Sequence, residues 1–477
     1  MSEEEDLRHV KAQLELSRRR FLQRAAVVGV GAASLPLFAA CSNAATAAPT
    51  AAPTAAATAA ATAAPTAAPT AAATAAARML EFQGWEFQPE DIKAHLAAWT
   101  KVSGVPVNLS LIPNVGYGPA TQTKLQGGAT IDVFYNLTYN TGRFVDQGWA
   151  HDLKGFPGVD DMLNDMFPQA RARYVTSDGK IISAPYFNAV HTLMYNKSHL
   201  AKAGLQPPQS LQDVYDQSKK LKAGGIKTPY VAYWIKDFCE EYLNVYLIGE
   251  GVKMWDDKGA PVFADDPKTK AVMEWWLAMY KDGLTTPTML TDDPIKLATL
   301  MGTGEASFYV LHHYFLKIIR DLKDAPEKAN VDILYRIPSA TGKTFQMGEV
   351  IQMGTKGEGR SVDDAWSLMK AYGWKDSTGQ YSTFKSWAKA AQLGAPYPAF
   401  FADPEVIAAF GANYDMPKLT DVFANGSDVQ GGRNAVWYQT FQAKVGDRIH
   451  ALLLGQATPA DTVTGLAADA KAAQGGI

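Results

Sequence analysis

Strand-like and helix-like segments alternate along residues 78–477, and this alternation constrains the fold more than any other feature. Short apolar runs at residues 79–83, 105–111 and 130–135 have the composition of strands. Between the first two runs, Ile92, Leu96 and Trp99 recur at helical spacing. Strands that alternate with helices in this order predict a parallel sheet covered by helices.

The same alternation continues to the end of the chain. Further strand-like runs are expected at 181–185, 192–195, 230–233, 306–310 and 331–337. Helices are expected at 210–223, 238–249, 269–282, 361–372, 404–410 and 435–454. Because about 400 residues exceed what one core comfortably holds, the pattern predicts an α/β protein with two lobes.

Residues 1–41 have the order of an export signal. Arg18 and Arg19 belong to a Ser-Arg-Arg-x-Phe-Leu sequence that resembles the twin-arginine signal. The uncharged run 25–40 that follows is too short and too weakly apolar for a comfortable membrane span. Small residues then precede Cys41, as at a lipoprotein cleavage site, so we expect Cys41 to carry lipid. The alternative is a plain anchor helix that contains paired arginines.

Residues 42–77 are almost wholly Ala, Thr and Pro. They carry no charge and no large apolar group, and their prolines interrupt helices, so they predict an extended linker between lipid and domain. With Cys41 acylated, Cys239 has no intramolecular disulfide partner. We expect Cys239 to be a buried, inert thiol.

The overall charge argues against a nucleic-acid partner. The formal net charge is -3, and no long basic cluster follows the N-terminus. The hydrophobic content of 47% and the charged content of 19% are those of an ordinary globular protein.

Six segments, in order, resemble the extracellular solute-binding proteins of ABC importers, in the group that includes the maltose/maltodextrin-binding proteins. They lie at 127–153, 179–197, 203–208, 301–308, 348–351 and 455–461. The stretch Gly-Lys-Ile-Ile-Ser-Ala-Pro at 179–185, followed by Leu-Met-Tyr-Asn-Lys at 193–197, is the most telling. The resemblance spans nearly all of residues 78–473.

The resemblance implies a periplasmic-binding-protein-like fold with a hinge and an interlobe cleft. Lobe one would take residues 78–186 and 337–393, and lobe two would take 187–336 and 394–477. It further implies a monomeric, lipid-anchored protein outside the cytoplasm, without cofactor. Such a protein captures a carbohydrate, an oligosaccharide in our interpretation, and delivers it to the transmembrane subunits of an ABC permease.

Aromatic and amide residues after the expected strands are the candidates for sugar contact. Aromatic faces stack on sugar rings, and amides or carboxylates bond the hydroxyls. Ligands of open α/β sheets bind beyond the carboxyl ends of the strands. The candidates are Trp85, Asn136, Tyr139, Asn140, Asn188, Trp234, Asp237, His312, Glu349, Trp437 and Tyr438. Each has an alternative role, since tryptophans such as Trp85, Trp234 and Trp437 also fill cores, and Glu349 could be a surface carboxylate. Trp275 and Trp276 lie mid-helix and are expected to be core.

Enzyme and metal functions find little support. Adjacent His312 and His313 do not share a face of a helix or strand, so no metal site is predicted. The Asp pairs at 256–257, 265–266 and 292–293 are better explained by turns and helix caps than by glycoside hydrolysis. The alternatives kept open are a polyamine, glycerol phosphate or metal as solute, a tethered glycan hydrolase, and a sensor subunit. The candidates carry few charges, which favours a neutral, hydroxyl-rich ligand.

Overall fold

A computed structural model describes residues 79–114, 116–357 and 360–475. Arg18, Arg19, Cys41 and the linker 42–77 lie outside the described residues, so the expected signal, lipidation site and linker remain predictions. Within the described ranges, no helix is long and apolar enough to cross a membrane.

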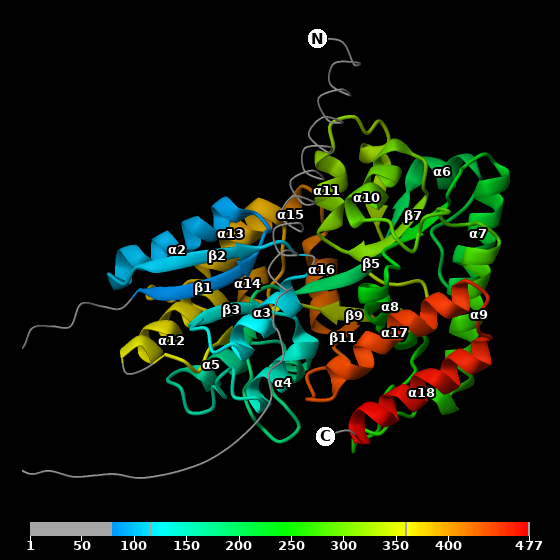
Figure 1. The fold of residues 1–477 in the computed structure, drawn as a ribbon. Coiled ribbons are helices and arrows are strands. Elements are labelled where there is room, and N and C mark those ends of the chain that lie inside the picture. The colour runs from blue at the N-terminus through cyan, green and yellow to red at the C-terminus, as the bar shows by residue number, and fades with distance from the viewer. Residues whose placement is uncertain (1–78, 115, 358–359, 476–477) are drawn as a thin grey trace, which may run out of the picture. The chain divides into compact units, whose positions relative to one another are not determined.

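Two separate sheets organise the described part of the chain (Figure 1). The strands are β1 (Leu80–Trp85), β2 (Val107–Ile112), β3 (Val133–Asn136), β4 (Ala184–Pro185), β5 (Ala189–Asn196), β6 (Tyr230–Ala232), β7 (Phe308–His312), β8 (Val331–Ile333), β9 (Thr344–Met347), β10 (Val350–Met353) and β11 (Ser427–Asp428). The first sheet has the order β2-β1-β3-β10-β4, and the second has the order β11-β9-β5-β7-β6, with β8 also paired to β5. We call the two sheets with their helices lobe one and lobe two.

The described residues also form thirteen of the longer helices. They are α2 (Pro89–Ser103), α3 (Tyr117–Gln126), α7 (Leu211–Ala223), α8 (Cys239–Glu250), α9 (Pro267–Lys281), α10 (Pro294–Thr303), α11 (Phe315–Asp321), α12 (Arg360–Gly373), α13 (Ser382–Ala391), α15 (Pro404–Gly411), α16 (Met416–Ala424), α17 (Tyr438–Leu453) and α18 (Pro459–Gly475). Shorter helical turns are η1 (Thr138–Asn140), α4 (Thr141–Asp146), α5 (Val159–Asn164), η2 (Pro168–Arg173), α6 (Lys197–Lys202), η3 (Lys236–Phe238), η4 (Phe263–Asp265), η5 (Lys328–Asn330) and α14 (Pro398–Phe401).

Lobe one begins as the expected parallel sheet. Strand β1 pairs in parallel with β2 and β3, and α2 and α3 make the connections. Helix α2 starts at Pro89, where a missing N–H costs nothing, and is capped after Ser103 by Gly104, whose φ of 72° suits glycine. Strands β10 and β4 then add antiparallel pairs, and α12 packs against β1, β3, β4 and β10.

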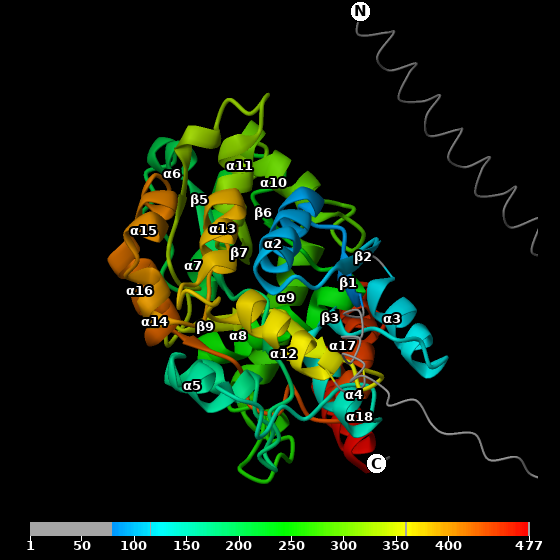
Figure 2. The same cartoon turned by 90° about the vertical axis from the view of Figure 1, so that its left-hand side faces the viewer.

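Lobe two is built around the buried strand β5. It pairs antiparallel with β7, β8 and β9, while β6 runs parallel to β7. Helices α8, α9, α17 and α18 pack on one another beside this sheet, and Figure 1 shows them grouped on the right. Helices α14, α15 and α16 form a second group that contacts α13 and β11 (Figure 2).

The chain passes between the sheets at adjacent crossing segments. The first runs from β4 to β5 through residues 186–188, and the second joins β9 to β10 at Gly348 and Glu349. The two touch, because the Glu349 carbonyl accepts the N–H groups of Tyr186 (2.9 Å) and Phe187 (3.3 Å). Strand pairing differs from the expected lobe boundary at one point: β9, expected in lobe one, belongs to the six-stranded sheet. A four-residue buried strand is too short to be assigned to a sheet from its own sequence.

The core contains the residues that were expected to be structural. Trp276 is fully buried and Trp275 is 8% exposed. Cys239 is a free, buried thiol whose pKa is raised by burial, as expected of an inert cysteine. The acidic pairs act as caps and turns: Asp266 accepts the N–H of Lys268, and Asp293 accepts those of Ile295 and Lys296.

Candidate functional site

The two lobes touch where α4 and residues 172–175 of lobe one meet residues 434–439 of lobe two. Gly142 lies so close to the Asn434 carbonyl that an added Cβ would come within 2.0 Å of that oxygen. Arg143 Nη1 donates to Gln439 Oε1 at 2.7 Å, and Asn434 Nδ2 donates to the carbonyls of Ala172 (3.0 Å) and Val175 (3.0 Å). The described structure therefore has its lobes in contact.

Arg433 occupies the centre of this contact. It is 3% exposed, and its guanidinium binds the Glu240 carboxylate through Nε (3.0 Å) and Nη2 (2.9 Å). The Tyr438 hydroxyl also donates to Glu240, at 2.5 Å. The guanidinium lies 5.5 Å from the ring centre of Tyr139 in lobe one and 5.2 Å from that of Phe345 in lobe two. Its Nη1 has no hydrogen-bond partner among the described residues.

Glu349 brings the second crossing segment into the same site. Its carboxylate accepts the Thr138 N–H at 3.1 Å. Burial raises the pKa of Glu349 to about 8, more than nearby Arg433 lowers it, so the carboxyl group is mainly neutral at pH 7. Glu349 also interacts electrostatically with Tyr139 and with buried Arg173. We call Tyr139, Arg173, Glu240, Glu349 and Arg433 the interlobe cluster.

A second group, His191, Glu241 and His312, lies beside Arg433 in lobe two. Glu241 Oε2 is 3.5 Å from His191 Nε2 and 3.3 Å from His312 Nε2. Glu241 Oε1 lies 3.7 Å from Arg433 Nη2. All three side chains are at most 5% exposed. The three come from α8 and from the neighbouring strands β5 and β7, which pair His191 with His312.

Several residues expected at the site lie together. Tyr139 and Glu349 belong to the interlobe cluster, Tyr438 binds its Glu240, and His312 contacts Glu241. Asn188 lies in the first crossing segment and is fully buried. Asn140 is 3% exposed, and its Oδ1 has no hydrogen-bond partner among the described residues.

The other expected residues are placed elsewhere or already have partners. Trp85 is 5% exposed and packs on Tyr117, Tyr135 and Tyr186 in lobe one. Trp234 is fully buried and packs on Tyr230 and Trp276. Asn136 donates to Gln352, Trp437 packs edge-on against Trp255, and Asp237 is exposed.

Sequence reasoning did not select Arg173, His191, Glu240, Glu241 or Arg433. The signal that could have found Arg433 is its position four residues before Trp437, just ahead of the helix expected at 435–454. Glu240 and Glu241 lie in the first turn of α8, where acidic residues are common because they interact favourably with the helix dipole, so their presence there is not a signal of a site.

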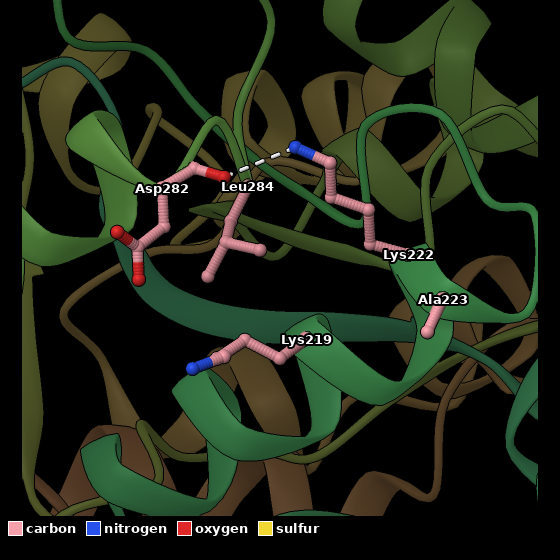
Figure 3. Close-up of a pocket in the computed structure, with 5 residues that line it drawn as sticks. All are labelled: Lys219, Lys222, Ala223, Asp282 and Leu284. Carbon is pink, nitrogen blue, oxygen red and sulfur yellow. Dashed lines mark hydrogen bonds between the residues drawn. The ribbon is translucent and has the colours of Figure 1, made fainter.

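A surface hollow beside α7 is not part of this site. Figure 3 shows its lining, Lys219, Lys222, Ala223, Asp282 and Leu284. The Lys222 ammonium donates to the carbonyls of Asp282 (3.0 Å) and Gly283 (2.6 Å), so two of its three N–H donors bind the backbone. This hollow contains no residue of the interlobe cluster.

Comparison with known families identifies the family of this chain and agrees with its fold. The family model of the bacterial extracellular solute-binding proteins matches residues 88–427. The chain therefore belongs to the family of bacterial extracellular solute-binding proteins.

Solved structures share its fold. One is maltose-bound MalE3 of T. maritima, with a TM-score of 0.70 and 20% identity, covering 82% of this chain and 99% of that one. Another is the GacH receptor of Streptomyces glaucescens GLA.O, with a TM-score of 0.70 and 16% identity. The similarity covers 83% of this chain and 99% of the receptor chain. These similarities confirm the expected two-lobed α/β fold.

Curated relatives match over a short stretch. The chain is 46% identical over 89 residues to the sn-glycerol-3-phosphate-binding periplasmic protein UgpB of Shigella flexneri, and 42% identical over 89 residues to that of Escherichia coli K12. The match spans 18% of this chain and 20% of each relative, so it covers about a fifth of their length.

Proposed function

We propose that this chain is the solute-binding subunit of an ABC importer, which captures a carbohydrate between its lobes and delivers it to the permease without turnover. One observation carries the proposal: Tyr139 of lobe one, Arg433 of lobe two and Glu349 of the crossing segment meet at one place. A solute that contacts both lobes stabilises their contact and thereby signals its presence to a partner.

The chemistry of the interlobe cluster favours a neutral solute with many hydroxyl groups. The positive charge of Arg433 is matched by Glu240, and Glu349 is mainly neutral at pH 7. Arg433 Nη1 and Asn140 Oδ1 offer a buried donor and a buried acceptor. Hydroxyl groups satisfy both kinds of partner, and the Tyr139 ring offers a face for a sugar ring. Structural neighbours include proteins solved with maltose, acarbose and cycloalternan.

The N-terminal sequence supports a location outside the cytoplasm. Family membership implies export, Arg18 and Arg19 fit a twin-arginine signal, and Cys41 fits a lipid attachment site. The protein is then a lipid-anchored monomer held off the membrane by residues 42–77.

Glycerol phosphate is the second candidate solute. Buried Arg173 and Arg433 are the type of residue that binds phosphate, and the stretch shared with the sn-glycerol-3-phosphate-binding proteins supports this alternative. It requires a phosphate to compete with Glu240 for Arg433.

Thermal unfolding of the full-length chain with candidate solutes tests both. We expect a maltodextrin at 100 times its dissociation constant to add about 2.7 kcal/mol of stability. The same sample, analysed for sugar breakdown, should show none. Stabilisation by sn-glycerol 3-phosphate alone would select the second candidate, and consumption of the sugar would contradict a pure binding function.

Tyr139 provides a test of the site itself. Tyr139→Ala removes a ring that faces Arg433, so we expect the solute dissociation constant to rise roughly 10–100-fold, equivalent to about 1.4–2.7 kcal/mol. The matched control is Tyr280→Ala, which removes a half-buried tyrosine from α9. Calorimetric titration measures both, and equal affinities in the two variants would place the solute elsewhere.

A further inference from the structure

His191, Glu241 and His312 present three ligating atoms to one point. One ring nitrogen of His191, one of His312 and a carboxylate oxygen of Glu241 all lie within 4.8 Å of one another. The two distances to Glu241 Oε2, 3.5 Å and 3.3 Å, approximate the separation of about 3.4 Å between neighbouring ligands of tetrahedral zinc. Two imidazoles and one carboxylate also form a common ligand set of zinc sites with an open fourth position.

His191 is the least explained member of the group as a structural residue. It is fully buried, and neither of its ring nitrogens makes a well-formed hydrogen bond among the described residues, since its Nε2 lies 3.5 Å from Glu241 Oε2. Its ring stacks against Phe345 with centroids 5.7 Å apart and lies edge-on to His312 at 4.5 Å. A buried polar group without a partner is costly, and a bound ion is one of the few things that would satisfy it.

The arginine nearby does not exclude a cation. Arg433 binds Glu240 through two bonds of 3.0 Å and 2.9 Å, whereas its nearest approach to Glu241 is 3.7 Å. Its charge is therefore matched chiefly by Glu240, and the Glu241 carboxylate remains for an ion.

The surroundings of His312 also suit a ligand. Its Nδ1 lies 3.1 Å from the Tyr314 hydroxyl. When Nδ1 carries the hydrogen and donates it to Tyr314, Nε2 presents its lone pair toward Glu241 and His191. Metal-binding imidazoles are commonly oriented in this way by a partner on the second nitrogen.

We propose that His191 Nε2, His312 Nε2 and Glu241 bind one divalent transition-metal ion of the zinc class in lobe two. The fourth ligand is a water molecule or the solute. Because Glu241 faces Arg433, which contacts Tyr139 of lobe one, parting of the lobes gives an ion access to the group. The three protein ligands of this site do not depend on the identity of the proposed solute.

Cobalt binding to the full-length chain tests the site without any solute. The protein is stripped with a chelator and titrated with Co²⁺, whose visible bands are intense only in tetrahedral or five-coordinate sites, and then with Zn²⁺ as competitor. We expect one equivalent of Co²⁺ to bind and one equivalent of Zn²⁺ to displace it. His191→Gln, His312→Gln and Glu241→Gln should each weaken binding roughly 100-fold, while His95→Gln, a buried histidine outside the group, should not change it.

If circular dichroism shows that a variant is unfolded, the wild-type protein still tests whether the metal site exists. X-ray absorption of its zinc complex should show two imidazole ligands and oxygen. Absence of saturable metal binding in the wild-type chain would overturn the proposal. Binding that persists unchanged in all three folded variants would do so as well, since the ion would then lie elsewhere.

Discussion

At the scale of single residues, His95 makes folding stability depend on pH. His95 is 9% exposed, and its ring nitrogens have no hydrogen-bond partner among the described residues. Its ring lies edge-on to the rings of Trp387 and Tyr372, with centroid distances of 4.8 Å and 5.7 Å. Burial lowers its pKa from 6.5 to about 4. The unfolded chain therefore takes up this proton first, and stability is lost as the pH falls from about 6.5 toward 4.

His95→Phe should remove this dependence while keeping an aromatic ring. Between pH 7 and pH 4 we expect the unfolding free energy of the wild-type protein to fall by about 3 kcal/mol more than that of the variant. Urea denaturation of the full-length chain at several pH values measures the difference. Parallel curves for the two proteins would show that His95 is protonated equally in the folded and unfolded states.

At the scale of elements, α7 begins with a reciprocal cap. Ser210 Oγ accepts the Asp213 N–H at 3.0 Å, and Asp213 Oδ2 accepts the Ser210 N–H at 3.2 Å. Ser210→Ala removes the acceptor for one N–H, so we expect unfolding free energy to fall by about 1 kcal/mol. Lys220→Ala, at an exposed position of the same helix, should change it by less than about 0.5 kcal/mol. Urea denaturation of both variants measures these changes. An equal loss of unfolding free energy in Ser210→Ala and Lys220→Ala would mean that the cap has no specific stabilising role.

Helices and strands could be predicted from the sequence more completely than the residues of the interlobe cluster and the histidine group. Helices such as 210–223 carry both a periodic apolar face and a capping residue, and α7 begins within one residue of the expected start. Strand β9 carries neither signal, because it is short and buried, and its sheet is decided by pairing with β5. The histidine group is harder still: His191 and His312 are 121 residues apart in sequence and become neighbours only through antiparallel pairing.

At the scale of the whole molecule, the resemblance correctly predicted a two-lobed α/β fold, but the interlobe cluster depends on how the lobes meet. Arg433 was overlooked because its role requires Glu240 of α8 and Tyr139 of lobe one at the same place. The distribution of charged residues along the sequence does not predict that these three side chains lie together. By contrast, Tyr139 and Glu349 follow a strand end and a crossing segment, positions where ligand contact is expected from the fold alone.

The lobe contact itself can be tested at Gly142. An added Cβ would meet the Asn434 carbonyl oxygen at 2.0 Å, and backbone atoms on both sides leave no flexible side chain to move aside. If solute capture requires this contact, Gly142→Ala should weaken solute binding at least roughly tenfold, about 1.4 kcal/mol, while the unliganded protein keeps its far-ultraviolet spectrum. Gly411→Ala is the matched control, since nothing lies within 4 Å of its added Cβ. Calorimetry gives the affinities, and small-angle scattering with saturating solute should show a larger radius of gyration for Gly142→Ala than for the control. Equal affinities and equal radii would mean that solute is held without the lobe contact described here, so that recognition belongs to one lobe.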